Sequence, residues 1–110
     1  MASEIDELMQ ALRLFRDERD WSQFHNAKDL AIGLSIEASE LLEAFLWKGA
    51  EDADPEKIKE ELADVFAFAF LLAEKYRLNV SEIVKAKIAA NEKKYPVEKA
   101  RGSSKKYSEL

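Results

Sequence analysis

The sequence lacks cysteine and is poor in the residues that break helices. It contains three glycines, two prolines and a single histidine in 110 residues. The absence of cysteine excludes disulfide bonds and thiolate chemistry, and it fits a reducing compartment. With 47% hydrophobic residues and few turn formers, the chain is predicted to be all-α. Its length predicts one domain, residues 1–110, with a modest core.

Long apolar runs are missing as well. The longest, VFAFAFLLA at residues 65–73, covers nine residues, which is about half of what a membrane-spanning helix needs. The N-terminus is polar and acidic, unlike that of a secretory signal peptide. We therefore expect a soluble, cytoplasmic protein with no membrane partner.

Positive charge is concentrated near the C-terminus. Residues 85–107 contain eight lysines and arginines and two glutamates, whereas the rest of the chain holds nine basic and twenty acidic residues. The net charge of −5 argues against nucleic acid as a partner. The basic segment is either a solubilising tail or a site for an anionic ligand.

Apolar periodicity and capping signals predict four helices followed by a polar, extended tail. Gly49 is expected to end the second helix as a C-cap, and Ser81 is expected to cap the fourth. Asp54 followed by Pro55 marks the start of the third. Ser3 with Asp6 resembles a capping pair for the first. The predicted elements span residues 3–20, 27–47, 55–77, 81–94 and, for the tail, 95–110.

The second and third predicted helices are apolar around most of their circumference. Such a helix is buried on several sides, and one small four-helix bundle cannot cover two of them. The pattern therefore predicts a homo-oligomer, either a dimer or a dimer of dimers.

Most of the second helix has acids without bases. No lysine or arginine occurs from Asp29 through Trp47, yet Glu37 and Glu40 lie three residues apart among apolar side chains. This spacing makes the two carboxylates neighbours, with Cβ atoms roughly 5–6 Å apart. Burying a carboxylate without a partner is costly, so positive charge from elsewhere is expected.

The third helix repeats this spacing with Glu61 and Asp64. Lys57 is placed to pair with Glu61 at i, i+4, but the positions four residues from Asp64 hold Glu60 and Phe68. If the two helices pack antiparallel, the four carboxylates converge. Either raised pKa values or bound cations would then relieve their repulsion.

Oxygen ligands alone favour a hard cation, with Mg²⁺ first and Mn²⁺ as a substitute. A di-iron bundle would need Glu-x-x-His on two helices, and the only histidine, His25, lies in a predicted connection. Solvated helix faces also carry acidic pairs at this spacing, so the pattern alone leaves a metal site and a plain surface equally open.

Five further segments accompany Glu37-x-x-Glu40 and Glu61-x-x-Asp64: ERDWSQFHNAKDL, EAFLWK, EELADV, ANEKKYP and RGSSKKYSEL. In this order, the blocks resemble the MazG-like, all-α nucleotide pyrophosphohydrolases, in particular their dCTP pyrophosphatase-like branch. The resemblance runs from the first helix to the C-terminus.

The resemblance implies Mg²⁺-dependent hydrolysis of a (deoxy)nucleoside triphosphate, such as dCTP or a modified dCTP, to the monophosphate and pyrophosphate. Such an activity cleanses the nucleotide pool. It implies that the metal ligands are Glu37, Glu40, Glu61 and Asp64. Glu37 or Glu40 would activate the attacking water, and the pattern does not choose between them.

Substrate contacts are expected from three parts of the chain. The resemblance suggests His25, Trp47 and Asn91 for the base. Lys87, Lys94 and Tyr95 share a predicted helical face with Asn91, and the two lysines could hold phosphates as point charges. The tail residues Arg101, Lys105, Lys106 and Tyr107 could close over the triphosphate.

A second hypothesis is a non-catalytic helical interaction module. In that case the apolar helices would serve assembly alone, and neither Mg²⁺ nor a nucleotide would bind.

Overall fold

The computed structural model describes residues 2–110, and the prediction of an all-α chain is confirmed, since no strand occurs in that range. It has five α-helices where four were predicted. The chain divides into two compact units, one up to Leu78 and one from Asn79 to Leu110. The helices are α1 (Glu4–Glu18), α2 (Ala27–Glu43), α3 (Pro55–Lys75), α4 (Val80–Lys94) and α5 (Val97–Ala100), with 3₁₀ helices at Trp21–Phe24, Ala50–Asp52 and Tyr107–Glu109.

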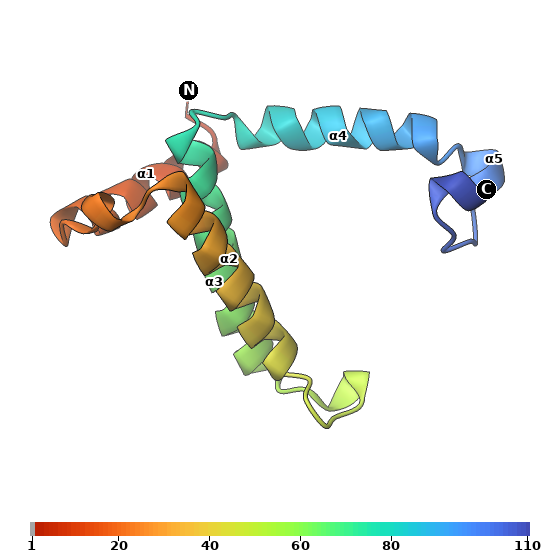
Figure 1. Ribbon diagram of the computed structural model, residues 1–110, viewed down its shortest axis with the longest axis horizontal. Coiled ribbons are helices and arrows are strands. Elements are labelled where there is room, and N and C mark those ends of the chain that lie inside the picture. Colours follow the sequence, from red (N-terminus) through yellow and green to blue (C-terminus); the bar gives the residue numbers. More distant parts are fainter. Residues whose placement is uncertain (1) are drawn as a thin grey trace. The chain divides into compact units, whose positions relative to one another are not determined.

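The first unit is built on a hairpin of α2 and α3, which lie side by side (Figure 1). Leu30 of α2 and Leu71 of α3 are among its few buried apolar side chains, with exposed fractions of 1% and 8%. α1 also contacts α3, and the Arg16 guanidinium donates to the Glu74 carboxylate at 2.9 Å. The hairpin is therefore the framework that positions the side chains of α2 and α3.

The starts of α1 and α3 follow the predicted signals, and α2 begins at the predicted residue 27. Ser3 and Asp6 form a reciprocal capping box, in which each backbone N–H donates to the other's side chain at 3.1 Å. Asn26 caps α2 by accepting from the Asp29 amide at 2.8 Å. Asp54 caps α3, and Pro55 occupies its first position, as predicted.

The predicted end of the second helix is wrong. α2 ends at Glu43, and Gly49 is not its C-cap. The amides of Ala44, Phe45 and Leu46 donate three residues back instead, at 3.0–3.2 Å, so the chain leaves the helix through tight 3₁₀-type turns. Trp47 itself takes the left-handed conformation, with φ 62°, so the reversal does not use the glycine.

Asn79, not Ser81, caps α4, because its side chain accepts from the Glu82 amide at 3.0 Å. α4 ends at Lys94, just before Pro96, as predicted.

The prediction of an extended tail is wrong. The tail contains α5 and the turn at Tyr107–Glu109. Within this second unit the rings of Tyr95 and Tyr107 meet edge to face, with centroids 6.0 Å apart, and this contact brings the tail back to the end of α4.

Along residues 2–110, no helix combines the length and apolar character that crossing a membrane would require.

Candidate metal centre

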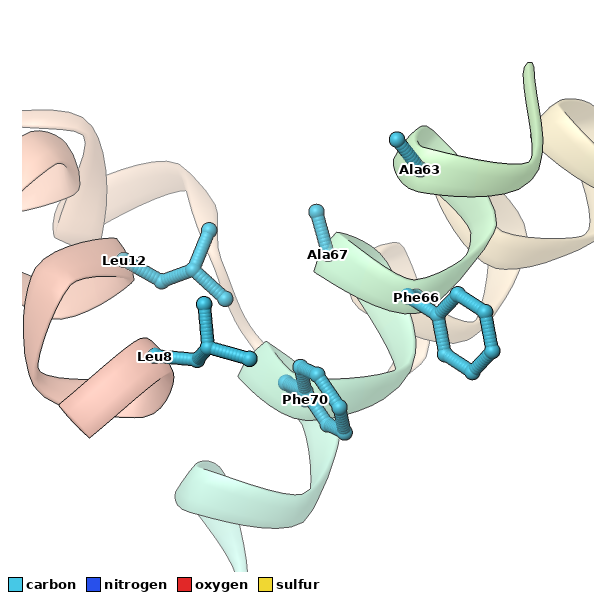
Figure 2. A pocket seen from close by; sticks show the side chains of 6 residues that line it. All are labelled: Leu8, Leu12, Ala63, Phe66, Ala67 and Phe70. Carbon is cyan, nitrogen blue, oxygen red and sulfur yellow. The ribbon is translucent and has the colours of Figure 1, made fainter. Parts of the chain in front are cut away.

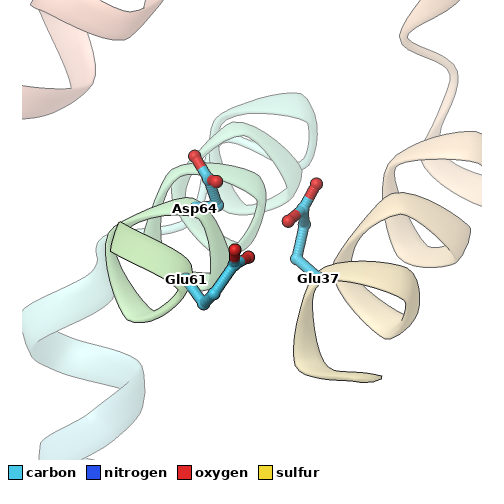
Figure 3. A group of neighbouring side chains, drawn as sticks. All are labelled: Glu37, Glu61 and Asp64. Carbon is cyan, nitrogen blue, oxygen red and sulfur yellow. The ribbon is translucent and has the colours of Figure 1, made fainter. Parts of the chain in front are cut away.

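Three carboxylates converge between α2 and α3. Glu37 projects from α2 toward Glu61 and Asp64 of α3, and one carboxylate oxygen from each lies within 4.8 Å of the other two (Figure 3). The i, i+3 spacing puts Glu61 and Asp64 on one face of α3, and the hairpin brings Glu37 opposite them. We call Glu37, Glu61 and Asp64 the acidic cluster.

Two oxygens of the acidic cluster have no partner. Oε2 of Glu37 and Oε2 of Glu61 are buried and accept no hydrogen bond from residues 2–110. Glu61 is 7% exposed, Glu37 is half-buried and Asp64 is exposed. A buried carboxylate oxygen without a donor is costly, and a bound cation removes that cost. With oxygen ligands only, the cluster suits a hard divalent metal ion.

The pKa of Glu37 on α2 and that of Glu61 on α3 are shifted in opposite directions. Burial raises the pKa of Glu37 to about 7, and its interaction with Glu40 and the charges of Asp64 and Glu61 add to the rise. The Lys57 ammonium lies 2.8 Å from Glu61, as predicted, and lowers the pKa of that carboxyl. In the absence of metal, proton uptake is therefore concentrated on Glu37.

Glu40 is the fourth predicted ligand and lies outside the acidic cluster. It is half-buried, and its carboxylate raises the pKa of Glu37 while it lowers that of Glu61. Glu40 is therefore an immediate neighbour of the cluster.

The sequence model of the MazG-like family matches residues 32–110, which include all four of these acids. This chain belongs to the MazG-like family.

Its relatives carry names that include a substrate. The dCTP pyrophosphatase 1 of Bos taurus is 36% identical over 104 residues, which cover 87% of this chain and 62% of that protein. The human protein of the same name is 38% identical, with 87% and 61% covered. The chain thus spans about 62% of the length of the curated relatives it matches.

A crystal structure of a pyrophosphatase from Archaeoglobus fulgidus has a similar fold. It superposes with a TM-score of 0.81 at 38% sequence identity, covering 87% of this chain and 95% of that one. The likeness extends over nearly the whole archaeal chain.

Trp47 lies outside α2, although the second helix was predicted to continue to residue 47. Because α2 ends at Glu43, Trp47 lies in the following turn, where its side chain is 98% exposed. A fully exposed indole in a left-handed backbone conformation is unusual and free to contact a ligand or another chain.

His25 lies in basic surroundings. Burial lowers the pKa of the His25 imidazole, and the charges of Arg16 and Lys75 lower it further. Its Nδ1 atom is buried without a hydrogen-bond partner within residues 2–110. Lys75 follows Asp64 by eleven positions on α3, which corresponds to about 16 Å of helix. The Lys75 charge that acts on His25 is therefore at the opposite end of the hairpin from the acidic cluster.

The second unit gathers some of its predicted substrate residues. Lys94 Nζ lies 5.0 Å from the centre of the Tyr107 ring, which also contacts Tyr95. Asn91 is half-buried and its carbonyl accepts from the Tyr95 amide at 2.8 Å. The remaining predicted residues of this unit are exposed: Lys87, Arg101, Lys105 and Lys106.

One contact beside the acidic cluster was not predicted. The Phe68 ring of α3 lies against Gly33 of α2, so close that a Cβ atom at Gly33 would be 2.4 Å from Phe68 Cε1. A glycine inside an otherwise apolar helix pattern was the available signal, since it commonly marks a close approach.

Proposed function

We propose that this protein is a Mg²⁺-dependent nucleoside triphosphate pyrophosphohydrolase acting on dCTP or a modified dCTP. The products would be the nucleoside monophosphate and pyrophosphate, and the role would be to cleanse the nucleotide pool. The observation that carries the proposal is the acidic cluster, with its two buried and unpartnered oxygens. The names of the relatives support the substrate class.

Glu37, Glu61 and Asp64 would hold the ion, with Glu40 beside them. Mg²⁺ would supply the positive charge that the carboxylates and the triphosphate both need, and it would make water a better nucleophile at neutral pH. Lys57 already neutralises part of the charge of Glu61. Glu37, which lacks a base, would therefore gain most from the ion.

Glu37 and Glu40 are the proposed catalytic carboxylates. Glu40 is not one of the three acids whose oxygens converge. Its carboxylate would therefore stay available to orient the attacking water and accept its proton. As the water oxygen bonds to phosphorus, the link between the α- and β-phosphates breaks and pyrophosphate leaves.

The basic second unit is the proposed phosphate-binding part. Lys87, Lys94, Arg101 and Lys106 would act on the triphosphate as positive charges. Tyr95 and Tyr107, whose contact holds the tail near Lys94, would order this group. His25, Trp47 and Asn91 are the proposed base contacts, and the exposed Trp47 indole offers a stacking face. Both units together would form one functional domain, residues 1–110.

Homo-oligomerisation, as a dimer or tetramer, is part of the proposal. An apolar groove of about 430 Å³ lies between α1 and α3, lined by Leu8, Leu12, Ala63, Phe66, Ala67 and Phe70 (Figure 2). Phe66 is 53% exposed there, an apolar surface that a second copy would cover. Light scattering should give a dimer or tetramer for the native chain and a smaller species for Phe66→Glu.

The deciding experiment measures pyrophosphate release from a panel of nucleoside triphosphates with Mg²⁺. Glu61→Gln and Asp64→Asn should each reduce kcat/KM at least about a hundredfold, because each replaces a charged carboxylate ligand of the ion by a neutral amide. Glu56→Gln is the matched control, since Glu56 is 78% exposed and only loosely paired with Lys59 at 4.0 Å.

Circular dichroism should show that these variants keep their helices. Retained turnover in both cluster variants would contradict the mechanism. If neither Mg²⁺ nor a non-hydrolysable dCTP analogue gives heat in titration calorimetry, the non-catalytic interaction module becomes the better explanation.

A further inference from the structure

We propose that the contact between Gly33 and Phe68 is a positioning device that sets the distance between α2 and α3 at the acidic cluster. Its effect on metal binding rests on the proposed function; its effect on helix spacing does not. Both residues are positioning residues, because they act through the carboxylates.

The contact lies one helical turn from the cluster on both helices. Gly33 precedes Glu37 by four residues on α2, and Phe68 follows Asp64 by four on α3. Residues four apart lie on the same face of a helix, so the contact and the cluster share one side of each helix. Any change in helix separation at the contact is therefore carried directly to the carboxylates.

The helices approach more closely here than a side chain at position 33 would allow. A Cβ atom on Gly33 would lie 2.4 Å from Cε1 of Phe68, 2.8 Å from Cδ1 and 3.0 Å from Cζ. Three ring atoms thus occupy the space that any other residue would fill. Phe68 is itself half-buried, so either the ring must leave the interface or the helices must separate.

This close approach opposes a repulsion that the cluster creates. Negative charges on Asp64 and Glu61 of α3 act on Glu37 of α2, and this repulsion pushes the two helices apart. Glycine within a helix costs about 1 kcal/mol relative to alanine, and here it gains close packing against an aromatic ring. Mg²⁺ requires its oxygens at about 2.0–2.1 Å in near-octahedral geometry, so small shifts between the helices matter.

The first test is a Mg²⁺ titration followed by the backbone amide signals of the acidic cluster. Gly33→Ala should weaken Mg²⁺ binding about tenfold or more, the size of effect seen when residues that orient metal ligands are changed. Adding Phe68→Leu to Gly33→Ala, which replaces the ring by a smaller side chain, should restore binding to within about threefold.

Ser35→Ala is the matched control. It raises helix propensity at an exposed position of α2 without adding a group next to Phe68, and should leave binding unchanged. Unchanged affinity in Gly33→Ala, or no recovery in the double variant, would overturn the inference.

The second test measures helix spacing without metal. Because the chain has no cysteine, Ser39→Cys with Glu60→Cys places one spin label on an exposed position of each helix. Dilution with unlabelled protein suppresses distances between chains. The distance should lengthen in Gly33→Ala and return in the double variant; an unchanged distance overturns the inference, whether or not Mg²⁺ binds. If the variants show these distance changes but the native protein does not bind Mg²⁺, only the proposed function is contradicted.

Discussion

The acidic pairs of α2 and α3 have the same sequence spacing and opposite electrostatic behaviour. Glu37 and Glu40 belong to a stretch without lysine or arginine, and the pKa of Glu37 rises to about 7. Glu61 is more deeply buried, yet its pKa is lowered because Lys57 lies 2.8 Å away. Burial alone therefore does not decide which acid takes up a proton in this cluster. The position of a single base decides it.

This difference has a functional meaning for a metal centre. Glu61 of α3 is partly compensated by Lys57 before any ion arrives, whereas Glu37 of α2 depends on the ion or on a proton for its compensation. Mg²⁺ and protons should therefore compete mainly at Glu37.

Replacing the uncompensated acid should have the largest effect. Glu37→Gln removes one donor of the cluster and should lower kcat/KM about a hundredfold or more in the pyrophosphate-release assay. Because glutamine carries no charge, the same variant should be more stable than the native chain at pH 8 without metal. Glu43→Gln, at an exposed position of α2, is the control and should change neither property. Lower stability of Glu37→Gln at pH 8 would show that Glu37 is compensated after all.

The pH dependence of stability should come next in size. The pKa of Glu37 is raised from 4.5 to about 7, so between these values the folded protein binds more protons than the unfolded chain. The contribution of Glu37 to stability is thus full below about pH 4.5 and is lost as the pH rises to about 7, by up to about 3 kcal/mol.

Urea unfolding at several pH values with a metal chelator present measures this loss. The slope assigned to Glu37 should vanish in Glu37→Gln, and saturating Mg²⁺ should raise stability most at pH 8. A stability that falls from pH 5 to pH 7 by the same amount in Glu37→Gln and in the native chain would assign the slope to other groups.

Removing Lys57 should make the pKa of Glu61 shift in the same direction as that of Glu37. Lys57→Met takes away the hydrogen bond and the charge that do most to lower the pKa of Glu61, so that pKa should rise. Carboxyl carbon shifts of Glu61 across a pH series measure the change. Lys59→Met is the matched control, because Lys59 lies 4.0 Å from the exposed Glu56. The overall stability should change little, since the Lys57 side chain is 52% exposed.

Placing a base next to the acids of α2 should produce the smallest effect. Ile36 precedes Glu40 by four residues and is 52% exposed, so Ile36→Lys reproduces on α2 the spacing of Lys57 and Glu61. The new charge should lower the pKa of Glu37 and reduce the pH dependence of stability, measured as above. Ile36→Gln should leave the pKa unchanged; equal effects of the two variants would mean that polarity, not charge, is responsible.

Local signals predicted much of the fold. The starts of α1, α2 and α3 follow from side chains that accept hydrogen bonds within three residues, such as Ser3 and Asp54, so the sequence suffices. The end of α2 was wrong because Gly49 looked like the natural cap, while Trp47 takes the left-handed conformation in its place. The folded tail was missed because the contact of Tyr95 with Tyr107 joins residues far apart in the sequence.

For the acidic cluster, the sequence by itself determined which residues carry the carboxylates and which of them has a lysine four residues away, because spacing along one helix fixes its faces and its nearest neighbours. The tertiary structure alone decided that Glu37, but not Glu40, meets Glu61 and Asp64, and that two of their oxygens are buried without partners. It also decided that α2 and α3 approach until Phe68 rests on Gly33. Such facts depend on the distance and register between two helices, which packing sets and no single helix encodes.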